Sequence, residues 1–141
     1  MGFIYSIIAG AAMSVQGVMN TRLGEKIGLY EANMYVQGTA FILSLAAMFI
    51  LGNGDLRSIS QANKWYLLGG VFGLGITIFV MLAMGKLSPT LAVSSILIAQ
   101  LITAAIIDAF GWMGSEKLAF GWNKYCGIGL LLAGVILFKW K

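Results

Sequence analysis

The sequence has no histidine and only one cysteine, Cys126, among its 141 residues. A single cysteine cannot form a disulfide within the chain. Without histidine, the chain also lacks the parts for a Ser-His-Asp or Cys-His catalytic centre or for a common structural zinc site. The sequence therefore predicts no enzyme activity, no metal site and no cofactor.

Charged residues are also scarce. Nine Lys and Arg with five Asp and Glu make up 10% of the chain, whereas a typical soluble domain carries about 25%. So few charges cannot cover the surface of a water-soluble protein of this size. The 60% hydrophobic content instead indicates an integral membrane protein. The net charge of +4 is scattered, with no Lys or Arg run, so nucleic acid is not an expected partner.

Five stretches are apolar enough to cross a bilayer, and none has a charged residue in its interior. A transmembrane helix needs about 20 such residues. The predicted spans are residues 2–20, 32–51, 65–84, 90–108 and 123–139. The sequence therefore predicts an all-α integral membrane protein, with residues 1–141 forming a single transmembrane domain of five helices. Pro89 suits the first turn of the fourth helix, where its missing N–H costs nothing.

The basic residues give almost no instruction for orientation. If the chain crosses the membrane five times, the nine basic residues divide almost equally between its two sides. The side of the N-terminus receives four: Arg57, Lys64, Lys117 and Lys124. The opposite side receives five: Arg22, Lys26, Lys86, Lys139 and Lys141. A clear Lys and Arg excess normally marks the cytoplasmic side. Either another feature fixes the orientation, or copies insert both ways up and pair as an antiparallel homodimer of ten helices. The second interpretation is favoured, because it supplies the inverted symmetry that larger transporters build with internal repeats.

Neutral amides are the most informative polar residues inside the spans. Gln16 and Asn20 share one face of the first helix, Asn33 and Gln37 repeat that spacing in the second, and Gln100 lies in the middle of the fourth. An amide in the bilayer needs a helix neighbour, water or a substrate as its partner. Two alternatives follow: the amides hold helices together, or they line a cavity. We predict a substrate-binding role for Gln16, Asn20, Gln37 and Gln100.

One acid and several glycines complete the candidate residues. Asp108 closes the fourth span, where it either serves as an interfacial cap or salt-bridge partner or is a candidate for ion coupling. Small residues let helix backbones approach closely. We therefore predict helix packing at four glycines in the third and fifth spans: Gly69, Gly70, Gly73 and Gly134.

Four segments in the correct order resemble the YdcZ-type family of small bacterial membrane proteins, which belongs to the drug/metabolite transporter superfamily. The likeness covers almost the whole chain. It rests on Gln16-Gly17-Val18-Met19-Asn20-Thr21-Arg22-Leu23-Gly24, on Trp65-x-x-Leu68-Gly69-Gly70-x-x-Gly73, on Gln100-Leu101-Ile102 with Ile107-Asp108-x-Phe110-Gly111, and on Gly127-x-x-Leu130-Leu131-x-x-Gly134-Val135. Ala99 departs from the glycine that many members carry before the fourth-span glutamine.

The resemblance implies a multi-pass protein of the bacterial inner membrane with five helices per chain. Members of the family occur as dual-topology homodimers, paired genes or fused tandem copies. The resemblance also implies kinship with the small multidrug resistance exporters, which use a glutamate in the first helix to exchange protons for cations. Here Gln16 occupies the comparable region, and an amide does not titrate in the useful range. Hence either Asp108 couples transport to an ion, or transport is uncoupled, or the ligand is not an organic cation.

Three functions compete on this sequence. The leading hypothesis is a transporter that exports a small solute by alternating access, with lipid, a second copy of the chain and the solute as its partners. The alternatives are a channel-like pore built on the same dimer and a membrane subunit that transports nothing itself. The sequence does not identify the solute.

Overall fold

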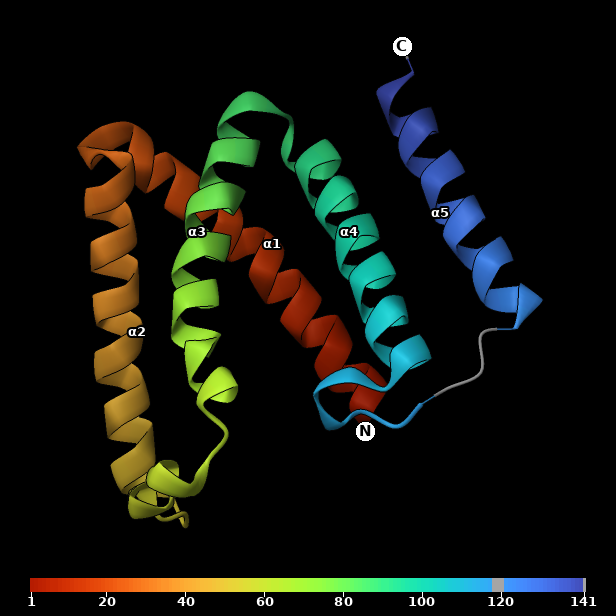
Figure 1. Cartoon of the computed structure of the whole chain (residues 1–141). Helices are drawn as coiled ribbons and strands as arrows, with labels where there is room; N and C mark the ends of the chain where they lie inside the picture. The colour runs from red at the N-terminus through yellow and green to blue at the C-terminus, as the bar shows by residue number, and fades with distance from the viewer. Residues whose placement is uncertain (118–120, 141) are drawn as a thin grey trace. The chain divides into compact units, whose positions relative to one another are not determined.

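The computed structural model describes residues 1–117 and 121–140, and these form helices and their connections without a strand. Figure 1 labels the helices along the chain. The helices are α1 (Gly2–Ile27), α2 (Leu29–Leu51), α3 (Gly69–Lys86), α4 (Pro89–Phe110) and α5 (Trp122–Lys139), with the short 3₁₀ helices η1 (Leu56–Gln61), η2 (Lys64–Leu68) and η3 (Trp112–Gly114). The predicted all-α architecture is confirmed. Lys141, one of the basic residues counted for orientation, lies outside the described residues.

Within the described residues, four helices are long and apolar enough to cross a membrane: α1, α2, the continuous η2–α3 segment Lys64–Lys86, and α4. They match the first four predicted spans. The fifth segment is also helical, but α5 has only 18 residues and includes Asn123, Lys124 and Lys139. It is not among the four membrane-length helices, so the fifth span stays a prediction.

The first helix runs further than the apolar pattern indicates. The predicted span stops at residue 20, whereas α1 continues for two more turns through Ile27. An ion pair between Arg22 and Glu25, with Nη1 2.9 Å from Oε2, joins residues three apart on this extension. Gly28 then ends the helix with φ of 103°, a conformation that glycine adopts easily. The connection between the first two predicted spans, residues 21–31, is therefore almost entirely helical, and Gly28 alone separates α1 from α2.

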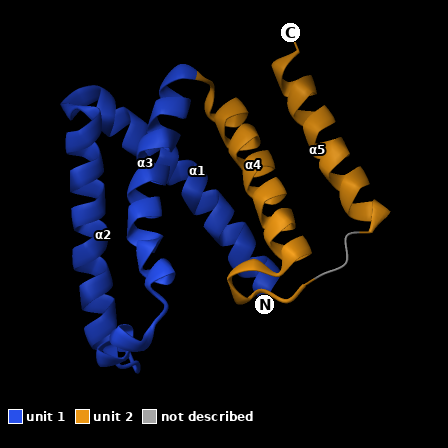
Figure 2. Cartoon of the chain, viewed as in Figure 1, with its two compact units in different colours: residues 1–86 blue, residues 87–141 orange. Residues whose placement is uncertain are grey.

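The chain divides into two compact units, residues 1–86 and residues 87–141 (Figure 2). The first contains α1, α2 and α3, each in contact with the other two, and the second contains α4 packed on α5. At the start of α4, the Ser88 hydroxyl accepts a hydrogen bond from the Leu91 N–H at 3.4 Å, and Pro89 occupies the first turn as predicted. The single transmembrane domain over residues 1–141 stays a prediction.

Buried side chains in the first unit gather where the end of α1, the start of α2 and the end of α3 meet. They are Asn20 and Thr21 of α1, Ala32 and Asn33 of α2, and Met81 and Met84 of α3. Glycines on α1 allow this approach. A Cβ placed on Gly17 would lie 2.7 Å from Cε of Met84, and one on Gly24 would lie 2.7 Å from Cε of Met81. With Thr21, these glycines form one small-residue face of α1 against α3.

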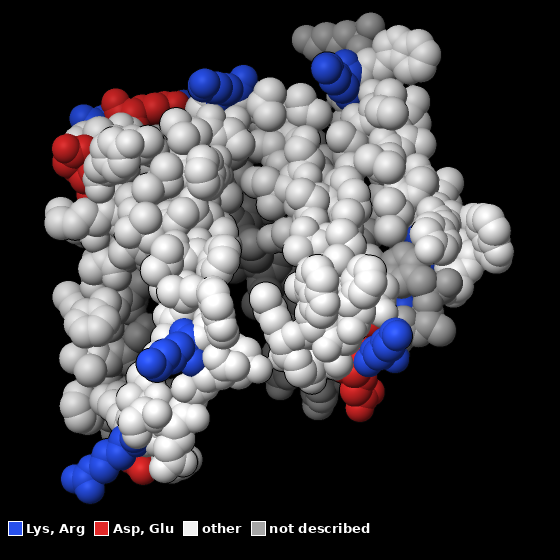
Figure 3. Space-filling model, viewed as in Figure 1, with Lys and Arg blue, Asp and Glu red and all other residues white. Residues whose placement is uncertain are grey.

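Away from this core, most large apolar side chains are exposed. Phe3, Phe41 and Phe72 illustrate this on the three helices of the first unit, with exposed fractions of 88%, 67% and 67%. Figure 3 shows charged side chains near the helix ends and uncharged side chains over most of the visible surface. Such a surface suits a hydrocarbon environment rather than water.

We expect Gly17→Leu to lower the free energy of unfolding by about 1–3 kcal/mol, because the new side chain would overpack against Met84 and Val80. Gly38→Leu is the matched control, since a Cβ at Gly38 meets nothing within 4 Å. Thermal unfolding of the purified protein in mild detergent measures both variants. Equal midpoints for the two would show that the contact between α1 and α3 does not restrict residue 17.

Candidate functional site

Of the two amides of α1, one lies at the surface of the first unit and the other borders its core. Gln16 is exposed, whereas Asn20 is only 8% exposed. Both line a shallow groove along α1, together with Ala11, Ala12, Val15 and Met19. The structure therefore brings Gln16 and Asn20 to one surface, as their spacing of four residues predicts.

The two amides of α2 lie close to the other helices of the unit. Asn33 is 5% exposed, and its Oδ1 is fully buried without a hydrogen-bond partner. Gln37 is half-buried, and its Nε2 donates to Thr77 Oγ1 of α3 at 3.5 Å, the long limit for a hydrogen bond. The Thr77 hydroxyl in turn donates to the Gly73 carbonyl at 2.9 Å. Gln37 thus has one weak partner, and Asn33 has none among the described residues.

Most serine and threonine hydroxyls in the helices are satisfied in a different way. They donate to a backbone carbonyl one turn earlier: Ser14 to Gly10 at 3.1 Å, Thr21 to Gly17 at 2.7 Å, and Thr103 to Ala99 at 2.8 Å. A hydroxyl bonded in this way needs no second helix. Among the described residues of α1, α2 and α3, every serine and threonine hydroxyl except that of Ser44 donates to its own helix. Of the four carboxamides on these helices, only Gln37 has a side-chain hydrogen bond.

Gln100 belongs to the second unit, where it is exposed on α4. The other three predicted substrate-binding residues, Gln16, Asn20 and Gln37, all belong to the first unit. A shared site for these four amides stays a prediction.

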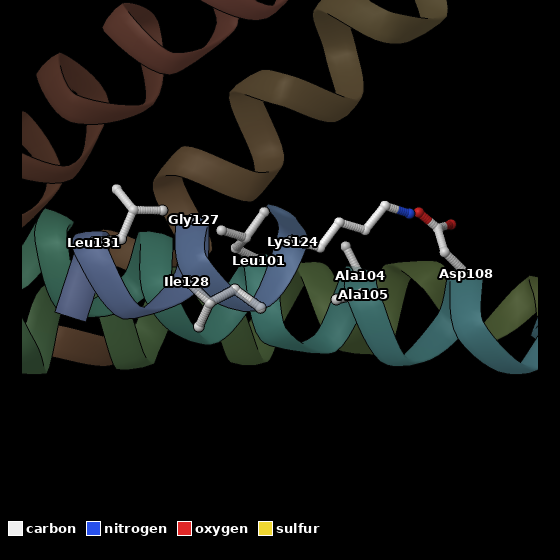
Figure 4. Close-up of a pocket in the computed structure, with 8 residues that line it drawn as sticks. All are labelled: Leu101, Ala104, Ala105, Asp108, Lys124, Gly127, Ile128 and Leu131. Carbon is white, nitrogen blue, oxygen red and sulfur yellow. The ribbon is translucent and has the colours of Figure 1, made fainter. Parts of the chain in front are cut away.

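Asp108 lies in a cleft of about 310 Å³ between α4 and α5. The other lining residues are Leu101, Ala104, Ala105, Lys124, Gly127, Ile128 and Leu131. Figure 4 shows the Lys124 ammonium group pointing toward the Asp108 carboxylate above this apolar wall. The cleft therefore places two opposite charges side by side. The sequence gives no sign of this proximity, because residues 109–122 separate the fourth predicted span from the fifth. Ion coupling by Asp108 stays a prediction.

The four glycines predicted for packing do not approach another helix within the described residues. A Cβ added at Gly69, Gly70, Gly73 or Gly134 meets nothing within 4 Å. A packing role for these four glycines stays a prediction, and it would require helix contacts that are not among those of the described residues. The close approach occurs at Gly17 and Gly24 instead, and the signal for it is the spacing Gly17-x-x-x-Thr21-x-x-Gly24.

No group of three or more metal-ligating side chains occurs among residues 1–117 and 121–140. Apart from charged residues near the helix ends, the polar groups of the helices are neutral amides and hydroxyls, and the α4–α5 cleft adds Asp108 and Lys124. Such groups bind and orient a solute by hydrogen bonds and supply no activated nucleophile.

Comparison with known proteins gives one match. The sequence model of a family described as "Putative inner membrane exporter, YdcZ" matches residues 1–137. No curated protein and no solved structure matches the chain significantly.

A double-mutant cycle on Gln37→Leu and Thr77→Val tests whether this amide holds α2 to α3. We expect a coupling energy of about 0.6 kcal/mol or less, because the 3.5 Å bond is long and such bonds in membranes are weak on average. Unfolding free energies measured by steric trapping in bicelles provide the cycle. A cycle of Gln37→Leu with Thr103→Val, whose hydroxyl bonds its own helix, should be additive. A coupling above about 1.5 kcal/mol would make Gln37 structural.

Proposed function

Because the chain belongs to the YdcZ family of inner-membrane exporters over residues 1–137, we propose that it exports a small solute by alternating access as a dual-topology antiparallel dimer. The protein is a multi-pass protein of the inner membrane, as the family and the four membrane-length helices agree. The family is one of exporters, which are not an enzyme class.

The observation that carries the proposal is the exposure of amides on membrane-length helices. Gln16 on α1 and Gln100 on α4 are exposed. The hydrocarbon core offers such a group no hydrogen bond, and leaving it unsatisfied costs several kcal/mol. Each amide therefore requires a water-filled cavity, a solute or further protein groups beside it. A transporter assembled from two copies supplies all three.

Limited burial also supports an assembly larger than one chain. At most 11% of the most apolar stretch of each membrane-length helix is buried. Lipid covers apolar side chains well but cannot serve the amides among them. A second copy that packs against these helices would shield the amides, and the near-equal distribution of Lys and Arg permits that copy to insert upside down.

An antiparallel pair of this kind needs α5 to cross the bilayer, so that the termini lie on opposite sides. Its 18 residues span about 27 Å at 1.5 Å per residue, slightly less than the hydrocarbon thickness of about 30 Å. Lys124 and Lys139 lie near the two ends of α5. Long lysine side chains reach the interface from such positions, and the bilayer thins slightly around a short helix. A fifth span is therefore physically allowed.

Ion coupling belongs to the α4–α5 cleft in this proposal. No acid lies in the interior of the predicted spans, and Asp108 is the acid nearest to them. Its carboxylate faces Lys124 from the neighbouring helix (Figure 4). A proton or cation that binds Asp108 would weaken its attraction to Lys124, and so would change how α4 and α5 hold together. This provides a physical link between ion binding and helix movement.

We expect Gln100→Ala to reduce solute flux about fivefold or more, since it removes a hydrogen-bonding group from the proposed cavity. Flux is measured in proteoliposomes by light scattering after an osmotic step with a panel of uncharged, cationic and anionic solutes. Gln61→Ala, an exposed amide of the connection between α2 and α3, is the control and should retain full flux. Unchanged flux for Gln100→Ala would remove Gln100 from the site.

Dual topology predicts comparable signals from two C-terminal reporters, one active only in the periplasm and one only in the cytoplasm. The double substitution Ser58→Lys and Ser60→Lys should make one of the two signals dominate. The added positive charges favour insertion with the 52–64 connection on the cytoplasmic side, so most copies would take one orientation. A one-sided signal from the unmodified chain would contradict the antiparallel dimer.

A further inference from the structure

The first unit contains four carboxamides on two adjacent helices, Gln16 and Asn20 on α1 and Asn33 and Gln37 on α2. Only one side-chain hydrogen bond involves any of them among the described residues, the long contact from Gln37 to Thr77. Each carboxamide offers two N–H donors and a carbonyl acceptor. Most of the polar capacity of these helices is therefore not used by the fold of the chain itself.

Asn33 is the most telling of the four. It is 95% buried, and its Oδ1 has no partner in the chain. A buried acceptor without a hydrogen bond lowers the stability of the fold. A buried polar group without a partner requires an explanation, and a partner that comes from outside the chain provides one.

The predicted spans of this unit have no charge to offer a charged solute. Its charged side chains, among them Glu31 directly before the second span, lie outside those spans. Residues 2–20, 32–51 and 65–84 contain no Asp, Glu, Lys or Arg. The first charged side chain of α1 beyond this region is Arg22, which pairs with Glu25 near the end of the helix. An ion taken into this region would lose its hydration without gaining an opposite charge, which is strongly unfavourable. An uncharged solute with hydrogen-bonding groups meets no such barrier.

We infer that the exported solute is uncharged and both donates and accepts hydrogen bonds, as polyols do, with Asn33 Oδ1 accepting one of them. This inference rests on the proposed export function and names its substrate class. In the described conformation Oδ1 is closed off, so solute reaches it in the other state of the alternating-access cycle. Asn33 is accordingly a binding residue whose amide is kept at a cost to stability.

Proteoliposome light scattering with erythritol and choline tests the inference, because the two solutes are similar in size and differ in charge. We expect erythritol to enter vesicles that contain the protein faster than protein-free vesicles, and choline to enter both equally. Asn33→Leu should reduce erythritol entry about fivefold or more, since it removes the acceptor. Gln61→Leu, the same change on the exposed connection, should leave entry unchanged.

A stability measurement separates solute binding from helix packing. Asn33→Leu should leave the thermal midpoint in detergent unchanged or raise it, because it replaces an unsatisfied buried amide with an apolar side chain of similar size. If Asn33 instead held helices together through its amide, the midpoint would fall, and the inference would be overturned. Unchanged erythritol entry for Asn33→Leu would also overturn it and would assign the acceptor to a bound water alone.

The remaining outcomes distinguish this inference from the proposed function. Protein-dependent entry of choline but not erythritol would overturn the uncharged substrate class and leave export in place. Entry of neither solute, together with no flux for any member of the wider panel, would overturn both.

Discussion

The hydrocarbon core of a bilayer cannot hydrogen bond, and this constraint governs the whole chain. It forces the backbone into helices, whose hydrogen bonds are internal, and it allows large apolar side chains such as Phe3 and Phe72 to remain exposed. It also makes each polar side chain in a span either self-satisfied or dependent on a partner. The hydroxyls of Ser14, Thr21 and Thr103 are self-satisfied through their own helices, and the carboxamides are not.

The first unit is held together by shape more than by polar bonds. Gly17 and Gly24 leave room on α1, and the thioethers of Met84 and Met81 fill that room from α3. Methionine is unbranched and has three rotatable side-chain bonds, so a contact of this kind adapts to small shifts between helices. Packing of this sort is compatible with a helix unit that changes conformation, because it does not depend on a single hydrogen-bond geometry.

The sequence was sufficient to predict the membrane class, the four membrane-length helices and the position of Pro89 in α4, because these follow from apolar runs and backbone chemistry. It did not predict the extension of α1 to Ile27, since polar residues beyond a span form helix as readily as loop in water. The proximity of Lys124 and Asp108 depends on how α5 packs on α4, which no local pattern encodes. Likewise, the spacing of Asn33 and Gln37 showed a shared face but not that only one of them has a partner.

The separation of roles between the two units follows from where the charges lie. The first unit has amides and no charge in its spans, so it suits recognition of an uncharged group, whereas the second has an acid and a lysine facing each other across two helices. Under the proposed function, different chemistry would carry recognition and coupling, and a neutral solute would not itself alter the charge balance at Asp108. Coupling between the two would then pass through helix movement rather than through direct competition for one carboxylate. Such a mechanism would differ from exchange on a first-helix glutamate, and Gln16, an amide that does not titrate, is compatible with that difference.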